Sequence, residues 1–162
     1  MISHQLPVVP DTALDVSDLK VYFYTEEGEV RAVDGVSFNM RRGRITALVG
    51  ESGCGKSVTS YSILRLIQKP GKIMGGRITF HPKDGDSLDV TALDEKSDAL
   101  YKLRGGKISM IFQEPMTALS PVHTVGNQIC EAILLHQDVT KEEARQKAVE
   151  MLGKVGIPGA EQ

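Results

Sequence analysis

The sequence predicts an α/β fold, and three observations support that prediction. A glycine-rich loop at residues 50–57 stands between a β-branched run at 45–49 and a segment with helical spacing at 57–67. Before this loop the chain is rich in valine and aromatic residues, which favour strands, and after residue 124 its apolar residues recur at helical spacing. We therefore expect a strand-rich region first, a mixed region around the loop, and a helical region last.

Composition and charge narrow the class of protein. The chain has 162 residues, of which 41% are hydrophobic and 25% are charged, and its formal net charge is -2. We therefore expect a soluble globular chain without a nucleic-acid partner. No apolar run approaches the roughly 20 residues that span a bilayer. The two cysteines form no C-x-x-C pair and suit a reducing compartment, so we expect the cytosol or the cytosolic face of a membrane. The histidines show no metal-ligand spacing, which disfavours a metal site built from His or Cys.

The first elements expected along the chain are two strands joined by a turn. Residues 1–15 contain prolines and few apolar positions, and we expect them to form a flexible leader. Residues 16–24 favour a strand, 26–29 a turn, and 30–40 a second strand. The sequence therefore predicts a β-hairpin ahead of the glycine-rich loop and of the core strand at 45–49.

The glycine-rich loop completes the pattern G-x-x-x-x-G-K-[ST] of a phosphate-binding P-loop, also called Walker A. Glycines let successive backbone N–H groups point inward, and the helix that follows offers its positive N-terminal end to the same anion. We expect Lys56 to place its charge at the β- and γ-phosphates and the Ser57 hydroxyl to hold Mg²⁺. The residues expected to contact the nucleotide are Gly50, Glu51, Ser52, Gly53, Cys54, Gly55, Lys56 and Ser57.

Cys54 is expected to contribute only its backbone N–H, because no base stands near its thiol in the sequence. Beyond the loop, the helix from residue 57 should end at 67, ahead of Pro70. A strand at 77–81 is expected to lead into a tight turn at the Asp84-Gly85 pair.

Further along the chain, residues 97–103 favour a short helix with a glycine cap, and residues 107–112 favour a second core strand. Pro115 removes a backbone donor, so a loop should begin near it. Two helices should follow, the first over 124–137. The second should open with a capping box at Thr140 and stop near Gly153.

Phosphate binding alone leaves several classes of protein open. A GTPase is disfavoured because the chain has no N-K-x-D segment to recognise guanine. A small-molecule kinase stays possible and would need a lid arginine, for which Arg104 and Arg145 are the candidates. A non-catalytic nucleotide-binding or interaction module is the third possibility. The second motif, MIFQEP at residues 110–115, separates these alternatives.

With both motifs in view, the chain resembles the N-terminal part of an ABC transporter ATP-binding subunit. More narrowly, it resembles the dipeptide, oligopeptide and nickel importer branch. The likeness covers roughly residues 16–160 and rests on VDGVSF at 33–38, VGESGCGKS at 49–57 and FQEPMTALSPVHTVG at 112–126. It implies a P-loop NTPase fold with an antiparallel β-subdomain, a partial RecA-like core and the start of a helical subdomain.

The resemblance also implies domains and residue roles. The expected domains are a leader at 1–15, the β-subdomain with the P-loop core at 16–113, and the Q-loop with part of the helical subdomain at 114–162. Gln113 takes the Q-loop position, where its side chain would touch Mg²⁺ or the attacking water and report the nucleotide state. Phe23 would stack on adenine, with Tyr24 as the alternative, although both could be ordinary strand aromatics.

The resemblance implies ATP and Mg²⁺ as cofactors, with Lys56 and Gln113 as the catalytic residues. The expected partners are a second ATP-binding subunit, transmembrane permease subunits and, indirectly, an extracytoplasmic substrate-binding protein. The expected location is the cytoplasmic face of the cell membrane, as a peripheral protein. Glu114 and residues 116–128 would either contact the permease or form a solvated loop.

Several motifs of the family are absent from residues 1–162. Residues 1–162 include no LSGGQ signature, no Walker B run ending in Asp-Glu and no switch histidine. The chain therefore resembles an N-terminal fragment of a subunit about twice as long. We expect these residues to bind nucleotide weakly or not at all on their own and not to hydrolyse it, because hydrolysis needs a water-orienting acid and a second loop over the γ-phosphate.

Overall fold

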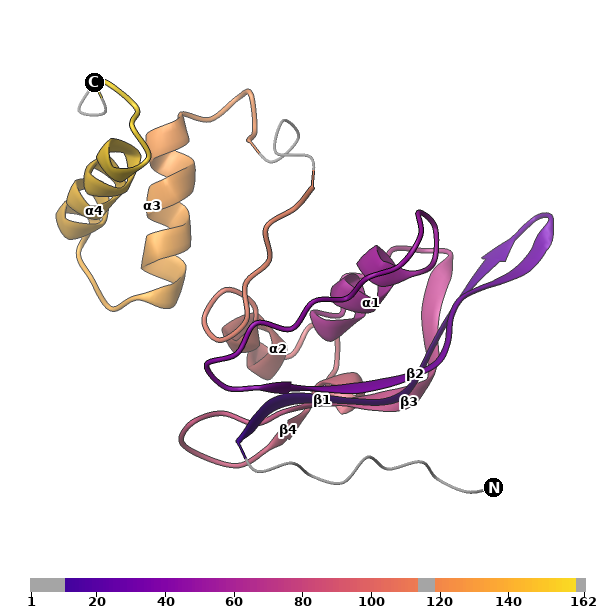
Figure 1. Ribbon diagram of the computed structural model, residues 1–162. Coiled ribbons are helices and arrows are strands. Elements are labelled where there is room, and N and C mark those ends of the chain that lie inside the picture. The colour runs from indigo at the N-terminus through magenta and orange to yellow at the C-terminus, as the bar shows by residue number, and fades with distance from the viewer. Residues whose placement is uncertain (1–10, 114–118, 160–162) are drawn as a thin grey trace. The chain divides into compact units, whose positions relative to one another are not determined.

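The computed structural model describes residues 11–113 and 119–159. The chain divides into two compact units, Met1–Lys107 and Ile108–Gln162. Figure 1 shows a sheet with short helices in the first unit and a pair of helices in the second.

The first unit is built on a four-stranded antiparallel sheet with the strand order β2-β1-β3-β4. Strands β1 (Thr12–Thr25) and β2 (Gly28–Arg41) form the predicted hairpin, joined by a turn at residues 26–27. β1 starts earlier than expected, within the predicted leader. The reason is that Leu14 is buried and lies between Met40 and Phe80 on its two neighbouring strands.

Strands β3 (Gly71–Phe80) and β4 (Leu88–Asp89) complete the sheet, and β3 pairs with β1. The strand expected at 77–81 is therefore longer at its start. The tight turn expected at Asp84-Gly85 is wrong, because residues 81–87 form one wider connection between β3 and β4. A hydrogen bond of 2.7 Å between the His81 ring and the Ser87 hydroxyl joins the two ends of this connection.

Helix α1 (Lys56–Ile63) follows the glycine-rich loop and packs on β1 and β2. It ends before residue 67 because Arg65 adopts a left-handed conformation, with φ of 54°. A short 3₁₀ helix η1 (Val90–Ala92) and helix α2 (Asp98–Leu103) complete the unit; the short helix predicted at 97–103 is confirmed, and Ser97 is its N-cap. The buried apolar side chains of this unit are Leu14, Val16, Leu19, Val21, Val33, Leu64, Ile78, Val90, Leu100 and Leu103.

Two expected core strands do not form among the described residues. Residues 45–49 join no sheet, and Ile45 is 100% exposed and Val49 87% exposed. Residues 107–112 also form no strand, and Ile111 is 100% exposed. Their apolar, β-branched composition favours a strand, but a strand also needs a partner for its backbone hydrogen bonds. No described strand takes that position, so both predictions are wrong for the chain as described.

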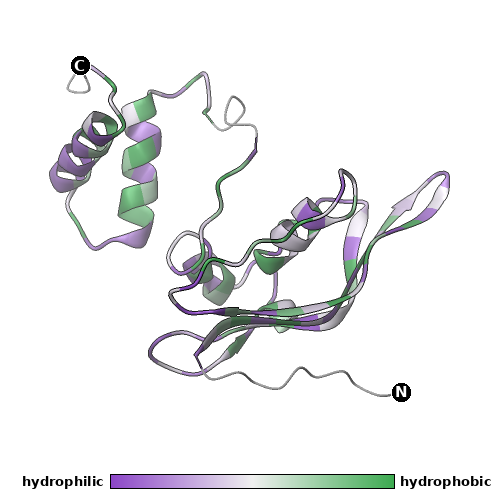
Figure 2. Ribbon diagram, viewed as in Figure 1, coloured by the Kyte–Doolittle hydropathy of each residue, from purple (hydrophilic) through white to green (hydrophobic). Residues whose placement is uncertain are grey.

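The second unit consists of helices α3 (Val125–His136) and α4 (Lys141–Lys154). Both predicted helices are confirmed, and each begins at a threonine N-cap. The capping box of α4 is complete, because Thr140 and Glu143 satisfy each other's backbone N–H groups. Ala144 and Ala148 are buried where α4 packs on α3. Figure 2 shows α3 as largely hydrophobic and α4 as largely hydrophilic.

Candidate phosphate-binding site

The end of the glycine-rich loop is fixed against strand β2. Gly55 has a φ of 92°, and a Cβ atom there would lie 2.2 Å from the backbone oxygen of Ala32. Both the backbone conformation and this close approach exclude a side chain. Gly53 also has a positive φ, of 82°, but nothing lies within 4 Å of its would-be Cβ. The local chain path therefore depends on glycine at both positions, and at Gly55 for an additional steric reason.

Lys56 opens α1, and its side chain lies along the loop. Its Nζ donates to the carbonyl oxygens of Gly50 at 2.9 Å and Glu51 at 2.6 Å, and lies 3.5 Å from Cys54 Sγ. The ammonium group is thus held among the loop's own backbone oxygens. Because Lys56 has a flexible stem and a compact charge, it can exchange these oxygens for those of a phosphate.

The first turn of α1 offers donors that an anion can use. The first N–H groups of an α-helix have no intrahelical acceptors, and α1 has no side-chain N-cap. No described residue accepts from the backbone N–H of Lys56 or Ser57, and the exposed Ser57 hydroxyl makes no hydrogen bond within the described residues. These groups lie at the positive end of the helix dipole, which favours phosphate. The chemistry of this donor set therefore suits a nucleotide phosphate with Mg²⁺.

The contacts of Cys54 lie within the glycine-rich loop itself. Its backbone N–H donates to the Glu51 carbonyl at 3.3 Å, forming a turn inside the loop. Its exposed thiol lies against Gly50, where a Cβ atom would come within 2.6 Å of Cys54 Sγ. In this structure, the residue therefore shapes the loop through its N–H and its side chain.

The two candidate adenine-stacking residues sit near the end of β1. The Phe23 ring packs over Gly71, where a Cβ atom would lie 2.6 Å from Phe23 Cε1. Tyr24 is 41% exposed, and its hydroxyl lies 3.4 Å from the sulfur of Met74. Lys72 Nζ lies 6.0 Å from the centre of the Tyr24 ring. Phe23 is partly covered and Tyr24 is open, and the assignment of the adenine contact stays a prediction.

Gln113 is exposed and belongs to the second unit. The glycine-rich loop belongs to the first unit. Glu114 and the first part of the 116–128 segment lie outside the described residues. The role expected for Gln113 therefore stays a prediction.

Sequence reasoning missed a pair of arginines at the far end of α1. Arg104 was a candidate lid arginine, but its guanidinium donates to the backbone oxygens of Leu64 and Arg65, each at 2.8 Å. Arg65 itself donates to the Thr91 oxygen at 2.5 Å. These contacts place Arg104 in the support of α1 and argue against a kinase lid at this position. No local pattern could have revealed them, because Arg104 and Leu64 are 40 residues apart in the chain.

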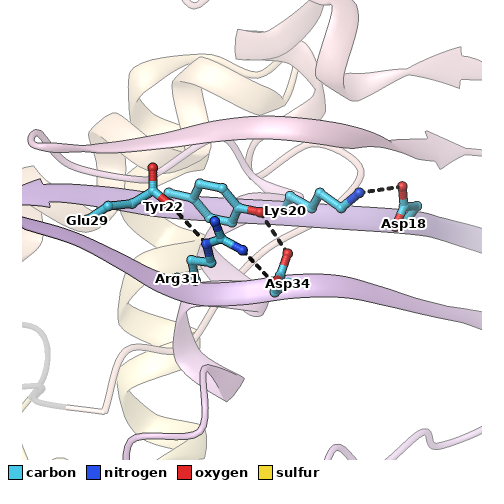
Figure 3. Close-up of polar contacts among 6 residues, drawn as sticks. All are labelled: Asp18, Lys20, Tyr22, Glu29, Arg31 and Asp34. Atoms are coloured by element: carbon cyan, nitrogen blue, oxygen red, sulfur yellow. Dashed lines mark hydrogen bonds and ion pairs between the residues drawn. The ribbon is translucent and has the colours of Figure 1, made fainter.

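A polar cluster on the solvent face of β1 and β2 supports the hairpin rather than the loop. The Tyr22 hydroxyl donates to Asp34 at 2.7 Å, and Arg31 lies 5.2 Å from the centre of the Tyr22 ring while contacting Glu29 at 2.9 Å (Figure 3). The hydrogen bond to Asp34 is the main reason that the pKa of Tyr22 is raised above its ordinary value. Each exposed pair of this kind contributes little to stability, so the cluster makes only a modest contribution to the register between β1 and β2.

Residues 11–113 and 119–159 show neither a metal-binding cluster of side chains nor a membrane-spanning helix. Within them, His, Cys, Asp and Glu do not gather in a group of three or more that could hold a metal ion. Among the same residues, no helix is both long and apolar enough to cross a membrane.

Together, the left-handed Gly55, the lysine within the loop and the open first turn of α1 define a P-loop nucleotide-binding protein. The family model of the ABC transporter matches residues 33–162, and the chain belongs to that family. The family and fold expected from the two sequence motifs are thereby confirmed, and members of this family bind ATP.

Comparison with known proteins adds relatives of peptide transport. The chain is 49% identical over 152 residues to the oligopeptide transport ATP-binding protein AppD of Bacillus subtilis, covering 93% of this chain and 44% of that protein. It is 48% identical over 149 residues to the dipeptide transport ATP-binding protein DppD of the same organism, covering 91% and 42%. The chain thus spans less than half the length of these relatives.

A solved structure shares the fold. The dimeric structure of MJ0796, a bacterial ABC transporter cassette, matches with a TM-score of 0.70 and 25% sequence identity. The match covers 86% of this chain and 56% of the cassette. The structure described here is therefore part of an ABC ATPase cassette, with the antiparallel β-sheet and helices that the sequence predicted.

Proposed function

We propose that residues 50–57 bind the phosphates of ATP and that the chain supplies this part of the ATP-binding subunit of a peptide importer. The observation that carries the proposal is the loop itself, in which Gly55 is fixed on Ala32 and Lys56 Nζ lies at the loop oxygens. The names of AppD and DppD, which refer to oligopeptide and dipeptide transport, support peptides as the cargo.

Each residue of the loop has a distinct task in this proposal. The backbone N–H groups at the start of α1 would bind phosphate oxygens, and Lys56 would neutralise the β- and γ-phosphates. The Ser57 hydroxyl would hold Mg²⁺, to which Gln113 would add an amide oxygen or position the attacking water. Phe23 or Tyr24 would stack on the adenine ring.

ATP hydrolysis, the partners and the location are proposed for the whole importer. The cassette MJ0796 has been solved as a dimer, and also in a post-hydrolysis state bound to ADP and Pi. These dimeric structures support a second ATP-binding subunit as the immediate partner. Permease subunits and, through them, a substrate-binding protein complete the proposed assembly at the cytoplasmic face of the membrane. Residues 1–162 would bind nucleotide only weakly and without sustained hydrolysis, since they contain no Walker B acid.

Isothermal titration with MgATP tests the proposal directly. We expect wild-type protein and Lys83→Ala to bind alike, because Lys83 is exposed in the 81–87 connection, away from the loop. Lys56→Ala should bind roughly ten-fold more weakly or not at all, because it removes the charge that pairs with phosphate. Equal affinities for Lys56→Ala and Lys83→Ala would contradict phosphate binding by this loop. Phosphate release that Lys56→Ala abolishes would overturn the proposed lack of turnover.

A further inference from the structure

Helix α1 carries the phosphate-binding groups but has few stabilising features of its own. Its N-cap is Gly55 without a side-chain cap, and it has no acidic residue in its first turn and no basic residue in its last. Its buried residues, Thr59 and Ser62, are both polar. An isolated helix of 8 residues is not stable in water, because nucleation costs more than so few hydrogen bonds return. The orientation of α1 must therefore come from tertiary contacts.

Arg104 supplies a positive charge and hydrogen-bond donors at the end of α1, where the helix has no basic residue of its own. Its Nε donates to the Leu64 oxygen and its Nη2 donates to the Arg65 oxygen, both at 2.8 Å. The guanidinium is planar, so its fork can satisfy two backbone oxygens at once with charge-assisted hydrogen bonds. It also places a positive charge at the negative end of the helix dipole. Arg104 is partly buried, which limits screening of these interactions by solvent.

Arg104 extends from a well-fixed part of the fold. It directly follows α2, in which Leu100 and Leu103 are fully or almost fully buried. A second arginine strengthens the connection, because Arg65 donates to the Thr91 oxygen at 2.5 Å and lies 3.6 Å from Glu95. The end of α1 is thus tied both to α2 and to the segment around η1.

We propose that Arg104 is a positioning residue for the phosphate-binding loop, an inference that rests on the function proposed above. Eight residues give α1 a length of about 12 Å, so it moves as one short rod. A tilt of about 5° at its far end would displace Lys56 and Ser57 by about 1 Å, enough to spoil hydrogen-bond geometry to a phosphate. By fixing the last turn, Arg104 sets the direction of the donors in the first.

Amide hydrogen exchange tests the support of α1 without any nucleotide. We expect Arg104→Gln to speed exchange of the backbone amides of α1 roughly ten-fold, because two charge-assisted bonds are lost. Arg104→Lys should give an intermediate increase, since an ammonium keeps the charge but not the fork. Arg145→Gln, an exposed arginine on α4, is the matched control and should leave α1 unchanged. Unchanged exchange in Arg104→Gln would overturn the inference.

Titration with MgATP and with magnesium pyrophosphate tests the positioning role. Each variant is measured at a temperature at which circular dichroism shows it folded, so that lost affinity does not reflect lost folded protein. Arg104→Gln should weaken both ligands by the same factor, about ten-fold, because both use the loop; Arg104→Lys should recover part of the affinity. Wild-type affinity in folded Arg104→Gln would refute the positioning role. Absence of binding by the wild-type protein would instead refute the proposed function, while hydrogen exchange still decides whether Arg104 supports α1.

Discussion

Two glycines of the loop allow the cost of a left-handed backbone to be measured separately from the cost of a steric overlap. Gly53 and Gly55 both have positive φ, but only at Gly55 would an added Cβ atom meet a backbone atom, the Ala32 oxygen at 2.2 Å. Real Cβ contacts essentially never fall below 3.0 Å, so the loop and β2 would have to separate. Gly53→Ala is therefore a matched control for Gly55→Ala within the same loop.

The size of each effect follows from these contacts. A left-handed conformation costs a residue with a Cβ atom about 1–2 kcal/mol, which is the whole cost expected for Gly53→Ala. Gly55→Ala bears the same cost and adds about 1–3 kcal/mol for the overlap with strand β2. We therefore expect Gly55→Ala to reduce the free energy of unfolding by about 2–5 kcal/mol, clearly more than Gly53→Ala.

Urea unfolding followed by tyrosine fluorescence measures this difference. The chain has 4 tyrosines and no tryptophan, and all the tyrosines lie in the first unit, so the signal reports on the unit that contains the loop. The midpoint should fall in the order wild type, Gly53→Ala, Gly55→Ala with similar slopes. Equal midpoints for the two variants would refute the claim that the loop is fixed against Ala32.

Three further predictions concern other parts of the chain. The pKa of Glu143 is lowered because the Thr140 N–H and hydroxyl donate to its carboxylate. The stabilisation that this cap gives α4 should therefore be fully present above the ordinary pKa of 4.5 and be lost as the pH falls through the lowered pKa. Amide exchange of α4 should show this loss, and Glu143→Gln should abolish the pH dependence. Asp34→Asn should lower the raised pKa of Tyr22, measured by NMR titration of its ring; an unchanged pKa would contradict the assigned cause. Phe23→Ala should weaken binding of MgATP but not of magnesium pyrophosphate, and unchanged MgATP affinity would contradict stacking of Phe23 on adenine.

Features set by neighbours in the chain were predictable from sequence. The hairpin, the short helix after residue 97 and the capping box at Thr140 all depend on residues a few positions apart, and each is present in the structure. The loop's glycines were predictable for the same reason, since their need for positive φ is local. Local chemistry thus identified both the candidate site and most elements around it.

Features that depend on distant partners were not predictable. The composition of residues 45–49 favours a strand, yet pairing requires a second strand that composition cannot specify. The support of α1 by Arg104 joins positions 40 residues apart, and the close approach of Gly55 to Ala32 joins two elements. Such contacts become visible only once the chain path is known.

The central claim is that the loop at residues 50–57 binds phosphate through the first turn of α1 and Lys56. Two-dimensional NMR of ¹⁵N-labelled protein during titration with MgATP tests it most directly. We predict that the largest shifts fall on the N–H groups of Gly53, Gly55, Lys56 and Ser57, and that Lys56→Ala suppresses them. Shifts confined to other regions, or equal shifts in Lys56→Ala, would contradict the claim.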